Sequence, residues 1–176
     1  GGAIICHDKK TKNHIDHLKN FGFIDETTIA ATGINGKMNE VSAAFGLLQL
    51  EHVDLIIEKR KKVDRLYRLL LENIEGIDIL HYNQGVTRNF SYFPILIKNN
   101  YHSSRDTLYQ KLKKIGINTR RYFYPLISEF PMYRGLPSAD ANNLLNATKI
   151  SSEVLCLPIY PDLEEETIIK ICESIK

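Results

Sequence analysis

The chain has 176 residues, of which 43% are hydrophobic and 25% are charged, and its formal net charge is +2. These values are ordinary for a globular protein of one domain, or of one domain with part of another, and the balanced charge excludes a nucleic-acid binder that relies on charge alone. Basic residues near position 60 alternate with acidic residues at helical spacing, which indicates a solvated helix face. No apolar run approaches the roughly 18 residues that a membrane-spanning helix needs, so we expect no membrane contact.

The three cysteines are scattered along the chain, at positions 6, 156 and 172. An odd number of separated cysteines favours free thiols in a reducing compartment over a disulfide framework, so we expect a cytoplasmic protein. Cys156 lies in an apolar run and is predicted to be a core residue. Cys6, His14 and His17 do not have the spacing of a standard zinc site, so no metal is predicted.

The first third of the chain predicts a strand, two helices and a loop. Residues 3–6 form an apolar run typical of a strand, and because a core strand rarely starts at a natural N-terminus we expect that further residues precede it. A short helix is expected over residues 11–21 and a polar loop over residues 24–36. Asn39 is typical of a helix N-cap, and the apolar period after it predicts a long helix to Ile74, in which residues 51–54 are a place for a bend or break.

The remaining residues predict a small sheet with packed helices, which is an α+β unit. Ser103 followed by Asp106 resembles a capping box, and Gly116 is expected to end that helix. Pro94 predicts that the second strand lies at an edge or carries a bulge there. Strands are expected at residues 77–81, 90–97 and 117–124, and helices at residues 103–116, at residues 142–155 and from Asp162 onward, the last with Ile168, Ile171 and Ile175 facing the core.

Residues 33–37 form a glycine-punctuated loop directly before the long helix. Gly33 and Gly36 flank Asn35, and Lys37 follows. A loop of this kind can present donors to an anion, so Asn35 and Lys37 are candidate ligands of a phosphate. The pattern is equally typical of a surface loop with helix-entry chemistry, and it matches neither standard glycine motif of nucleotide-binding proteins. Both interpretations stay open from the pattern alone.

Residues 120–125 read Arg-Arg-Tyr-Phe-Tyr-Pro. In an extended strand, alternation puts Arg120, Tyr122 and Tyr124 on one face and Arg121 and Phe123 on the other. The two tyrosines with Arg120 are therefore candidates for the mouth of a ligand site. A solvated strand end gives the same pattern.

Several short blocks occur together in a fixed order along the chain. They are Leu-Lys-Asn-Phe-Gly at 18–22, Gly-Ile-Asn-Gly-Lys-Met at 33–38, Ala-Ala-Phe-Gly-Leu-Leu-Gln-Leu at 43–50, Gly-Ile-Asn-Thr-Arg at 116–120, Tyr-Pro-Leu at 124–126 and Leu-Pro-Ile-Tyr-Pro at 157–161. In this order they resemble the C-terminal half of the DegT-type nucleotide-sugar aminotransferases, enzymes that use pyridoxal phosphate (PLP). The resemblance covers essentially the whole chain.

The resemblance implies an α/β to α+β fold: the C-terminal part of an aspartate-aminotransferase-like PLP-dependent transferase, with a small three-stranded sheet, packed helices and a remnant of the large domain. It implies that residues 1–45 are this remnant of the large PLP-binding domain. Residues 46–176 would form the small C-terminal domain, joined by the long helix. The Schiff-base lysine is expected upstream of Gly1, so no catalytic residue is expected in this chain, which by itself is expected to be inactive.

The resemblance also assigns roles to residues of the two candidate sites. In this family the asparagine that matches Asn35 reaches the cofactor phosphate of the neighbouring subunit, which implies a homodimer with a shared active site. Lys37 stands where the family usually has arginine, and it keeps the charge without the bidentate fork. Lys37, Arg120, Tyr122 and Tyr124 are candidate substrate contacts. Residue 127 is isoleucine where the family often has histidine, which points to a subgroup with a different sugar preference.

The activity that the resemblance implies is transfer of an amino group from glutamate to a keto group of a nucleotide-linked deoxysugar, in the biosynthesis of surface polysaccharides or glycosides. A non-catalytic regulator or structural subunit with the same fold remains an alternative. So does an unrelated α+β binding module. The sequence alone identifies neither the sugar nor the carbon that receives the amine.

Overall fold

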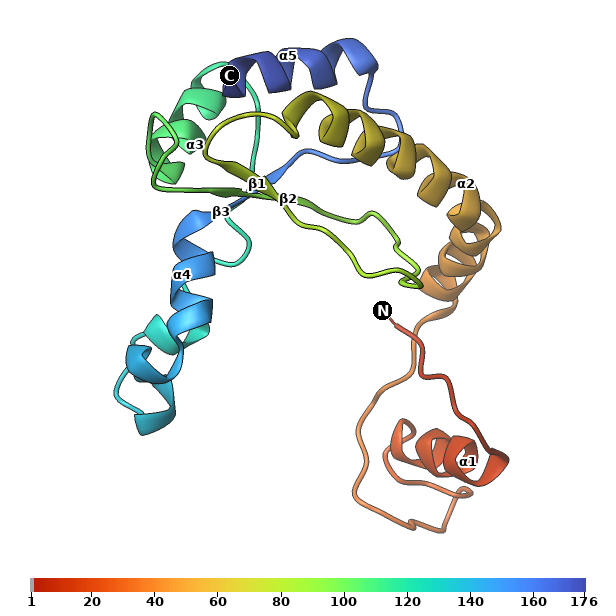
Figure 1. Cartoon of the computed structure of the whole chain (residues 1–176). Helices are drawn as coiled ribbons and strands as arrows, with labels where there is room; N and C mark the ends of the chain where they lie inside the picture. Colours follow the sequence, from red (N-terminus) through yellow and green to blue (C-terminus); the bar gives the residue numbers. More distant parts are fainter. Residues whose placement is uncertain (1) are drawn as a thin grey trace. The chain divides into compact units, whose positions relative to one another are not determined.

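The structure is a computed structural model that describes residues 2–176 (Figure 1). By its internal contacts the chain divides into two compact units, Gly1–Val53 and Asp54–Lys176. The first unit carries α1 (Lys9–Leu18) and the start of α2 (Glu40–Leu71), and the second carries the rest of α2, a sheet and three further helices.

Helix α1 begins at a side-chain cap and ends in a left-handed turn. Asp8 Oδ1 accepts a hydrogen bond from the backbone N–H of Thr11 at 2.8 Å. After Leu18 the chain reverses at Phe21 and Gly22, whose φ angles are 59° and 86°. The strand predicted for residues 3–6 was wrong: within residues 2–53 no strand lies beside this segment to complete a ladder, and it is extended but unpaired.

Helix α2 begins where the sequence predicted. Asn39 Oδ1 accepts from the backbone N–H of Ser42 at 2.8 Å, which confirms the N-cap. The helix is continuous through residues 51–54 and ends at Leu71, three residues before Ile74. No proline or glycine follows Gly46 within it, so nothing in the sequence forces a break.

The sheet of the second unit has three antiparallel strands in the order β1-β2-β3, namely β1 (Ile77–Ile79), β2 (Phe93–Ile97) and β3 (Val154–Leu157). In the register, Ile79 faces Ile95 and Leu96 faces Val154. Pro94 lies in the central strand of the sheet and not in an edge strand, which was one of the two predicted positions. However, β1 ends opposite Ile95, so the proline has no partner in β1 that would need its missing N–H.

The third strand is not the predicted one. Residues 117–124 contribute a single isolated bridge, in which Arg120 and Cys156 exchange backbone hydrogen bonds of 3.0 and 2.7 Å. The helix predicted over residues 142–155 stops at Glu153, and the four apolar residues after it form β3. This run is buried at every position, because it packs on both faces, and such continuous apolar runs fit a buried strand and a buried helix equally well in sequence.

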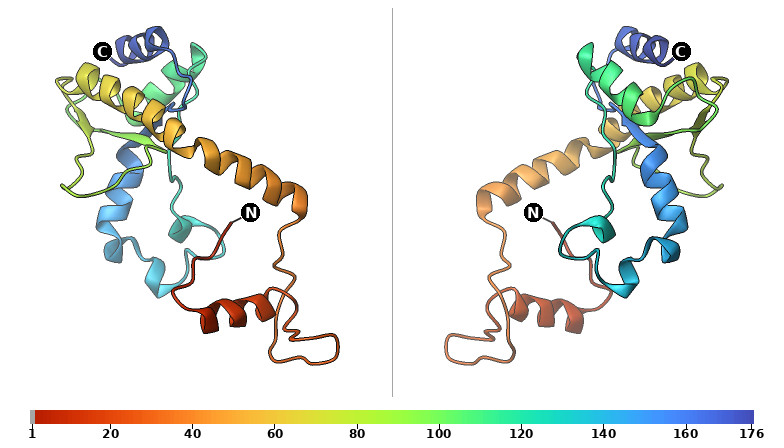
Figure 2. Two further views of the ribbon diagram at one scale, coloured as in Figure 1. Left: turned by 90° about the vertical axis from the view of Figure 1, so that its right-hand side faces the viewer. Right: turned by 90° about the vertical axis from the view of Figure 1, so that its left-hand side faces the viewer.

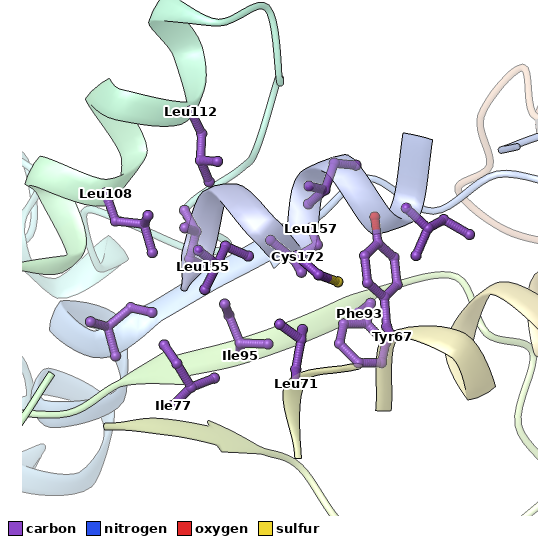
Figure 3. Close-up of a cluster of buried hydrophobic side chains, with 14 of the residues drawn as sticks. Tyr67, Leu71, Ile77, Phe93, Ile95, Leu108, Leu112, Leu155, Leu157 and Cys172 are labelled. Carbon is purple, nitrogen blue, oxygen red and sulfur yellow. The ribbon is translucent and has the colours of Figure 1, made fainter. Parts of the chain in front are cut away.

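Helices lie on both sides of the sheet. Helices α3 (Arg105–Lys114) and α5 (Glu165–Ile175) and the end of α2 pack on one face, and α4 (Leu145–Glu153) lies on the other (Figure 2). The larger core contains Tyr67 and Leu71 of α2, Leu108 and Leu112 of α3, and the inward residues of the strands (Figure 3). In α5, Ile168, Ile171 and Ile175 are buried as predicted.

One smaller expectation, the cap of the helix after β2, needs correction. Helix α3 is capped by Ser104 rather than Ser103, since the Ser104 hydroxyl accepts from the N–H of Thr107 at 3.1 Å. Gly116, with φ of 83°, follows its end as predicted. Between α3 and α4 the chain forms short 3-10 turns at Ile127–Glu129, Pro137–Ala139 and Ala141–Asn143.

Candidate functional site

The first candidate site is the loop at residues 33–37, which is fixed by two glycines. A Cβ on Gly33 would lie 2.3 Å from the nitrogen of Gly22 and 2.4 Å from the carbonyl oxygen of Leu18. A Cβ on Gly22 would lie 1.7 Å from the carbonyl oxygen of Ala31. Only glycine fits at either position, so the loop and the end of α1 pack backbone against backbone.

Backbone hydrogen bonds join this loop to the end of α1. The N–H of Ile34 donates to Leu18 O at 2.9 Å, and the N–H of Gly36 donates to Lys19 O at 2.8 Å. Asn35 forms an isolated antiparallel bridge with Asn20. The side chain of Asn35 is exposed and makes no hydrogen bond within residues 2–176, so the amide on this fixed backbone faces solvent.

Lys37 is held in the same unit. Its Nζ donates to Asn20 Oδ1 at 2.8 Å. Lys37 lies at a hollow of about 770 Å³ that Asp16 and two further lysines, Lys12 and Lys19, also line. Asp16 pairs with both, its Oδ1 being 2.6 Å from Lys19 Nζ. Hydrogen bonds from Lys12 and Lys19 lower the pKa of Asp16 to about 2.

The donors in this unit fit a phosphate. Asn35 offers an amide with no intramolecular partner in the described chain, and Lys37 offers an ammonium. Within residues 2–176 Lys37 forms no ion pair, so its charge is not cancelled. An amide and a cation on one rigid backbone segment suit an anion with several acceptor oxygens.

The second candidate site lies in the second unit. Arg120, Tyr122 and Tyr124 line one hollow of about 370 Å³, together with Thr119 and Arg121. The predicted alternation was wrong, because residues 121–124 turn rather than run as a strand. As a result Arg121 and Tyr124 share a side: the Arg121 guanidinium lies 5.2 Å from the ring centroid of Tyr124.

Helix α3 supplies Tyr109 to this hollow and two further side chains that contact its lining residues, and sequence reasoning missed all three. Arg121 Nη1 donates to Asp106 Oδ1 at 2.8 Å, and its guanidinium lies 4.5 Å from the centroid of the Tyr109 ring. The guanidinium of Arg105 lies 4.7 Å from the Tyr124 ring. These partners lie 12 to 19 positions apart in sequence and carry no local motif, so only the fold brings them together.

A buried hydroxyl also borders the hollow. Thr119 is 4% exposed, and its Oγ1 has no hydrogen-bond partner among the described residues. An unpaired buried hydroxyl is costly unless something outside the chain satisfies it. The motif Gly-Ile-Asn-Thr-Arg gave no chemical signal for this residue.

A buried charge cluster attaches the segment between β1 and β2 to α2. Asp64, 2% exposed, accepts from Arg68 Nε at 2.7 Å and from Arg88 Nη2 at 2.6 Å. The Arg88 guanidinium lies 3.9 Å from the centroid of Tyr82 and 4.4 Å from that of Phe90. Burial raises the pKa of Asp64, but the hydrogen bonds from Arg88 and Arg68 outweigh burial and leave this pKa below its ordinary value.

The described part of the chain holds no group of His, Cys, Asp or Glu residues arranged for a metal ion. Among residues 2–176, none of the helices is long and apolar enough to cross a membrane. Cys156 is buried in the smaller core as predicted, and burial raises the pKa of its thiol.

Comparison with known proteins was made for both sequence and structure. The chain is 57% identical over 175 residues to a dTDP-4-amino-4,6-dideoxy-D-glucose transaminase of Escherichia coli, covering 99% of the chain and 47% of that protein. It is 47% identical over 176 residues to a protein of the same name from Shigella dysenteriae, covering 100% of the chain and 47% of that protein. The chain therefore spans about half the length of the curated relatives it matches.

Solved structures share the fold. DesI, determined in the presence of its TDP-sugar product, superposes with a TM-score of 0.84 at 28% identity, over 97% of this chain and 43% of that one. DesV of S. venezuelae superposes with a TM-score of 0.88 at 22% identity, over 97% and 44%. These likenesses confirm the fold expected from the sequence, the C-terminal part of a PLP-dependent transferase.

The family comparison agrees with both results. A family model described as the DegT/DnrJ/EryC1/StrS aminotransferase family matches residues 1–176. The match covers both units and both candidate sites. The chain belongs to the DegT/DnrJ/EryC1/StrS aminotransferase family.

Proposed function

We propose that the protein to which these residues belong is a PLP-dependent aminotransferase that acts on a sugar linked to a nucleoside diphosphate. The observation that carries this proposal is the 57% identity, over 99% of the chain, to a named sugar-nucleotide transaminase. The 176 residues correspond to the C-terminal half of such an enzyme. The lysine that binds the cofactor lies outside them, so this chain by itself does not transaminate.

The relatives narrow the substrate class. Two of them, 57% and 47% identical, are named for a dTDP-linked sugar whose amine is on carbon 4. GDP-perosamine synthases from two bacteria are only 28% and 30% identical. We therefore assign thymidine diphosphate as the nucleotide, carbon 4 of a 6-deoxyhexose as the aminated position, and glutamate as the amino donor.

The residues of the chain take distinct roles in this proposal. Asn35 and Lys37 hold the phosphate of the cofactor in the active site of a second copy, which makes the enzyme a homodimer with shared sites. When bound, the cofactor supplies the electron sink for moving the amino group. Arg120, Tyr122 and Tyr124 form one wall of the sugar-nucleotide site, where a hollow lined by both guanidinium and phenol groups suits a phosphate next to a flat or sugar ring.

The test uses the whole gene product that contains this chain. The purified protein should bind PLP, and its cofactor absorbance should change when glutamate is added. It should then convert dTDP-4-keto-6-deoxy-D-glucose to the 4-amino sugar, detected by mass spectrometry. The GDP-linked 4-keto sugar is the matched control and should react at least tenfold more slowly in kcat/KM. A protein that binds no PLP would refute the proposal and favour a non-catalytic subunit.

A further inference from the structure

Asn20 contacts both residues that are candidates for the cofactor phosphate. Its Oδ1 accepts from Lys37 Nζ at 2.8 Å, and its backbone forms the antiparallel bridge with Asn35. The backbone of Asn20 is itself fixed, because its N–H donates to His17 O at 3.0 Å and its carbonyl accepts from Phe23 N–H at 3.0 Å. One half-buried residue therefore bonds the Lys37 ammonium and lies opposite Asn35 in the bridge.

The partner of Lys37 differs from the partner of the other lysines at this hollow. Lys12 and Lys19 share the carboxylate of Asp16, which offsets part of their charge. Lys37 is hydrogen-bonded to a neutral amide oxygen and forms no ion pair within residues 2–176. A neutral acceptor fixes the direction of the ammonium and leaves its full charge for an anion.

Orientation matters for a lysine more than for an arginine. The four-carbon stem is flexible, and fixing it when a ligand binds costs rotamer entropy. A hydrogen bond that already fixes the stem in the free protein removes this cost from the binding step. Lys37 has two further N–H groups after donating to Asn20, and these remain for a ligand.

We propose that Asn20 is a positioning residue, which holds the Lys37 ammonium beside Asn35 so that both donors meet one phosphate group. This inference rests on the proposed function, since the phosphate is that of the cofactor. It assigns to Asn20 no contact with the cofactor itself.

The experiment uses the whole gene product after its cofactor has been removed. It compares the affinities of this protein for two forms of the cofactor. PLP carries the phosphate, and pyridoxal is the same ring without it. Replacing Asn20 by alanine (Asn20→Ala) should weaken PLP binding roughly tenfold, the effect of losing one charge-assisted hydrogen bond, and leave pyridoxal binding unchanged. Equal weakening of both ligands would mean general damage and would overturn the proposal.

The variant Asn20→Asp separates positioning from a merely structural bond. Aspartate is nearly isosteric with asparagine and binds an ammonium more strongly, so a structural role predicts PLP affinity equal to that of the wild type or better. The positioning role predicts PLP affinity lower than in Asn20→Ala, because the carboxylate cancels the charge of Lys37 and repels the phosphate. Asn13→Asp, on the exposed side of α1, is the control for added negative charge and should change PLP affinity less than twofold.

A double variant shows whether Asn20 acts through Lys37. Asn20→Ala combined with Lys37→Ala should bind PLP as well as Lys37→Ala alone, since the residue that Asn20 orients is already absent. Additive losses would overturn the inference while leaving the proposed function intact. A wild-type protein that binds no PLP would overturn the proposed function first, so the two failures are distinguishable.

Discussion

Gly33 determines whether the loop at residues 33–37 can form. A methyl group at this position would lie 2.3 Å from the backbone nitrogen of Gly22, so Gly33→Ala must separate the loop from the end of α1. We expect faster hydrogen exchange at the amides of Ile34 and Gly36, which donate across this contact. Gly135→Ala, where a Cβ meets nothing within 4 Å, is the control and should leave exchange unchanged. Unaltered protection in Gly33→Ala would contradict the backbone packing described for this loop.

Thr119 offers a second test at the scale of one residue. Its buried hydroxyl lacks a partner among the described residues, so Thr119→Val removes a desolvated polar group at nearly constant volume. We predict a free energy of unfolding higher by about 1 kcal/mol, measured by urea denaturation. If the hydroxyl also contacts the substrate, Thr119→Val will raise KM for the sugar nucleotide in addition to raising stability. A loss of stability would show that the hydroxyl has a partner within the protein.

The segment between β1 and β2 is attached to α2 by Arg88. In Arg88→Ala, Asp64 stays buried with Arg68 as its partner, and the aromatic stack of Tyr82 and Phe90 loses its central guanidinium. We expect a loss of about 2–3 kcal/mol in the free energy of unfolding. Arg134→Ala, an exposed arginine with no ion pair among the described residues, should change it by less than about 0.5 kcal/mol. Equal effects of the two variants would show that the cluster does not stabilise the fold.

The same cluster predicts a pH dependence. The pKa of Asp64 is lower in the folded protein than its ordinary value of 3.8, so its contribution to stability is complete above that value. As the pH falls through the lowered pKa, the contribution disappears. The difference in unfolding free energy between wild type and Asp64→Asn should therefore be large near about pH 6 and shrink below about pH 3. A difference independent of pH would mean that folding does not change the pKa of Asp64.

At the scale of elements, sequence patterns predicted the helices better than the strands. The cap at Asn39 and the inward isoleucines of α5 follow from local rules and were confirmed. The third strand was assigned to residues 117–124 because Val154–Leu157 reads as a continuation of α4. Long-range packing decides which of the two apolar segments pairs with β2. No local sequence signal predicts this choice.

In the whole molecule, the residues of the candidate sites also divide into those that local sequence marks and those that only the fold brings into place. Asn35, Lys37 and the tyrosines of residues 122–124 stand out in sequence because glycines, charge and aromatic rings mark them. Asn20, Asp106 and Thr119 gave no such signal, because the contacts of the first two and the burial of the third arise only in the folded chain. Residues that hold other residues in place are the ones a sequence motif does not reveal.

In the proposed function, the loop at residues 33–37 completes an active site in a second copy of an aminotransferase. Mixing two inactive variants of the whole gene product tests this role of the loop. One lacks the cofactor-binding lysine, identified by borohydride reduction and peptide mapping, and the other is Asn35→Asp, which repels the phosphate.

After dissociation and reassociation, random pairing puts half of the subunits into mixed dimers, each with one intact shared site. The mixture should therefore recover about a quarter of the wild-type rate of 4-amino-sugar formation. If the mixture stays as inactive as its components, Asn35 does not act across the subunit boundary and the account is wrong.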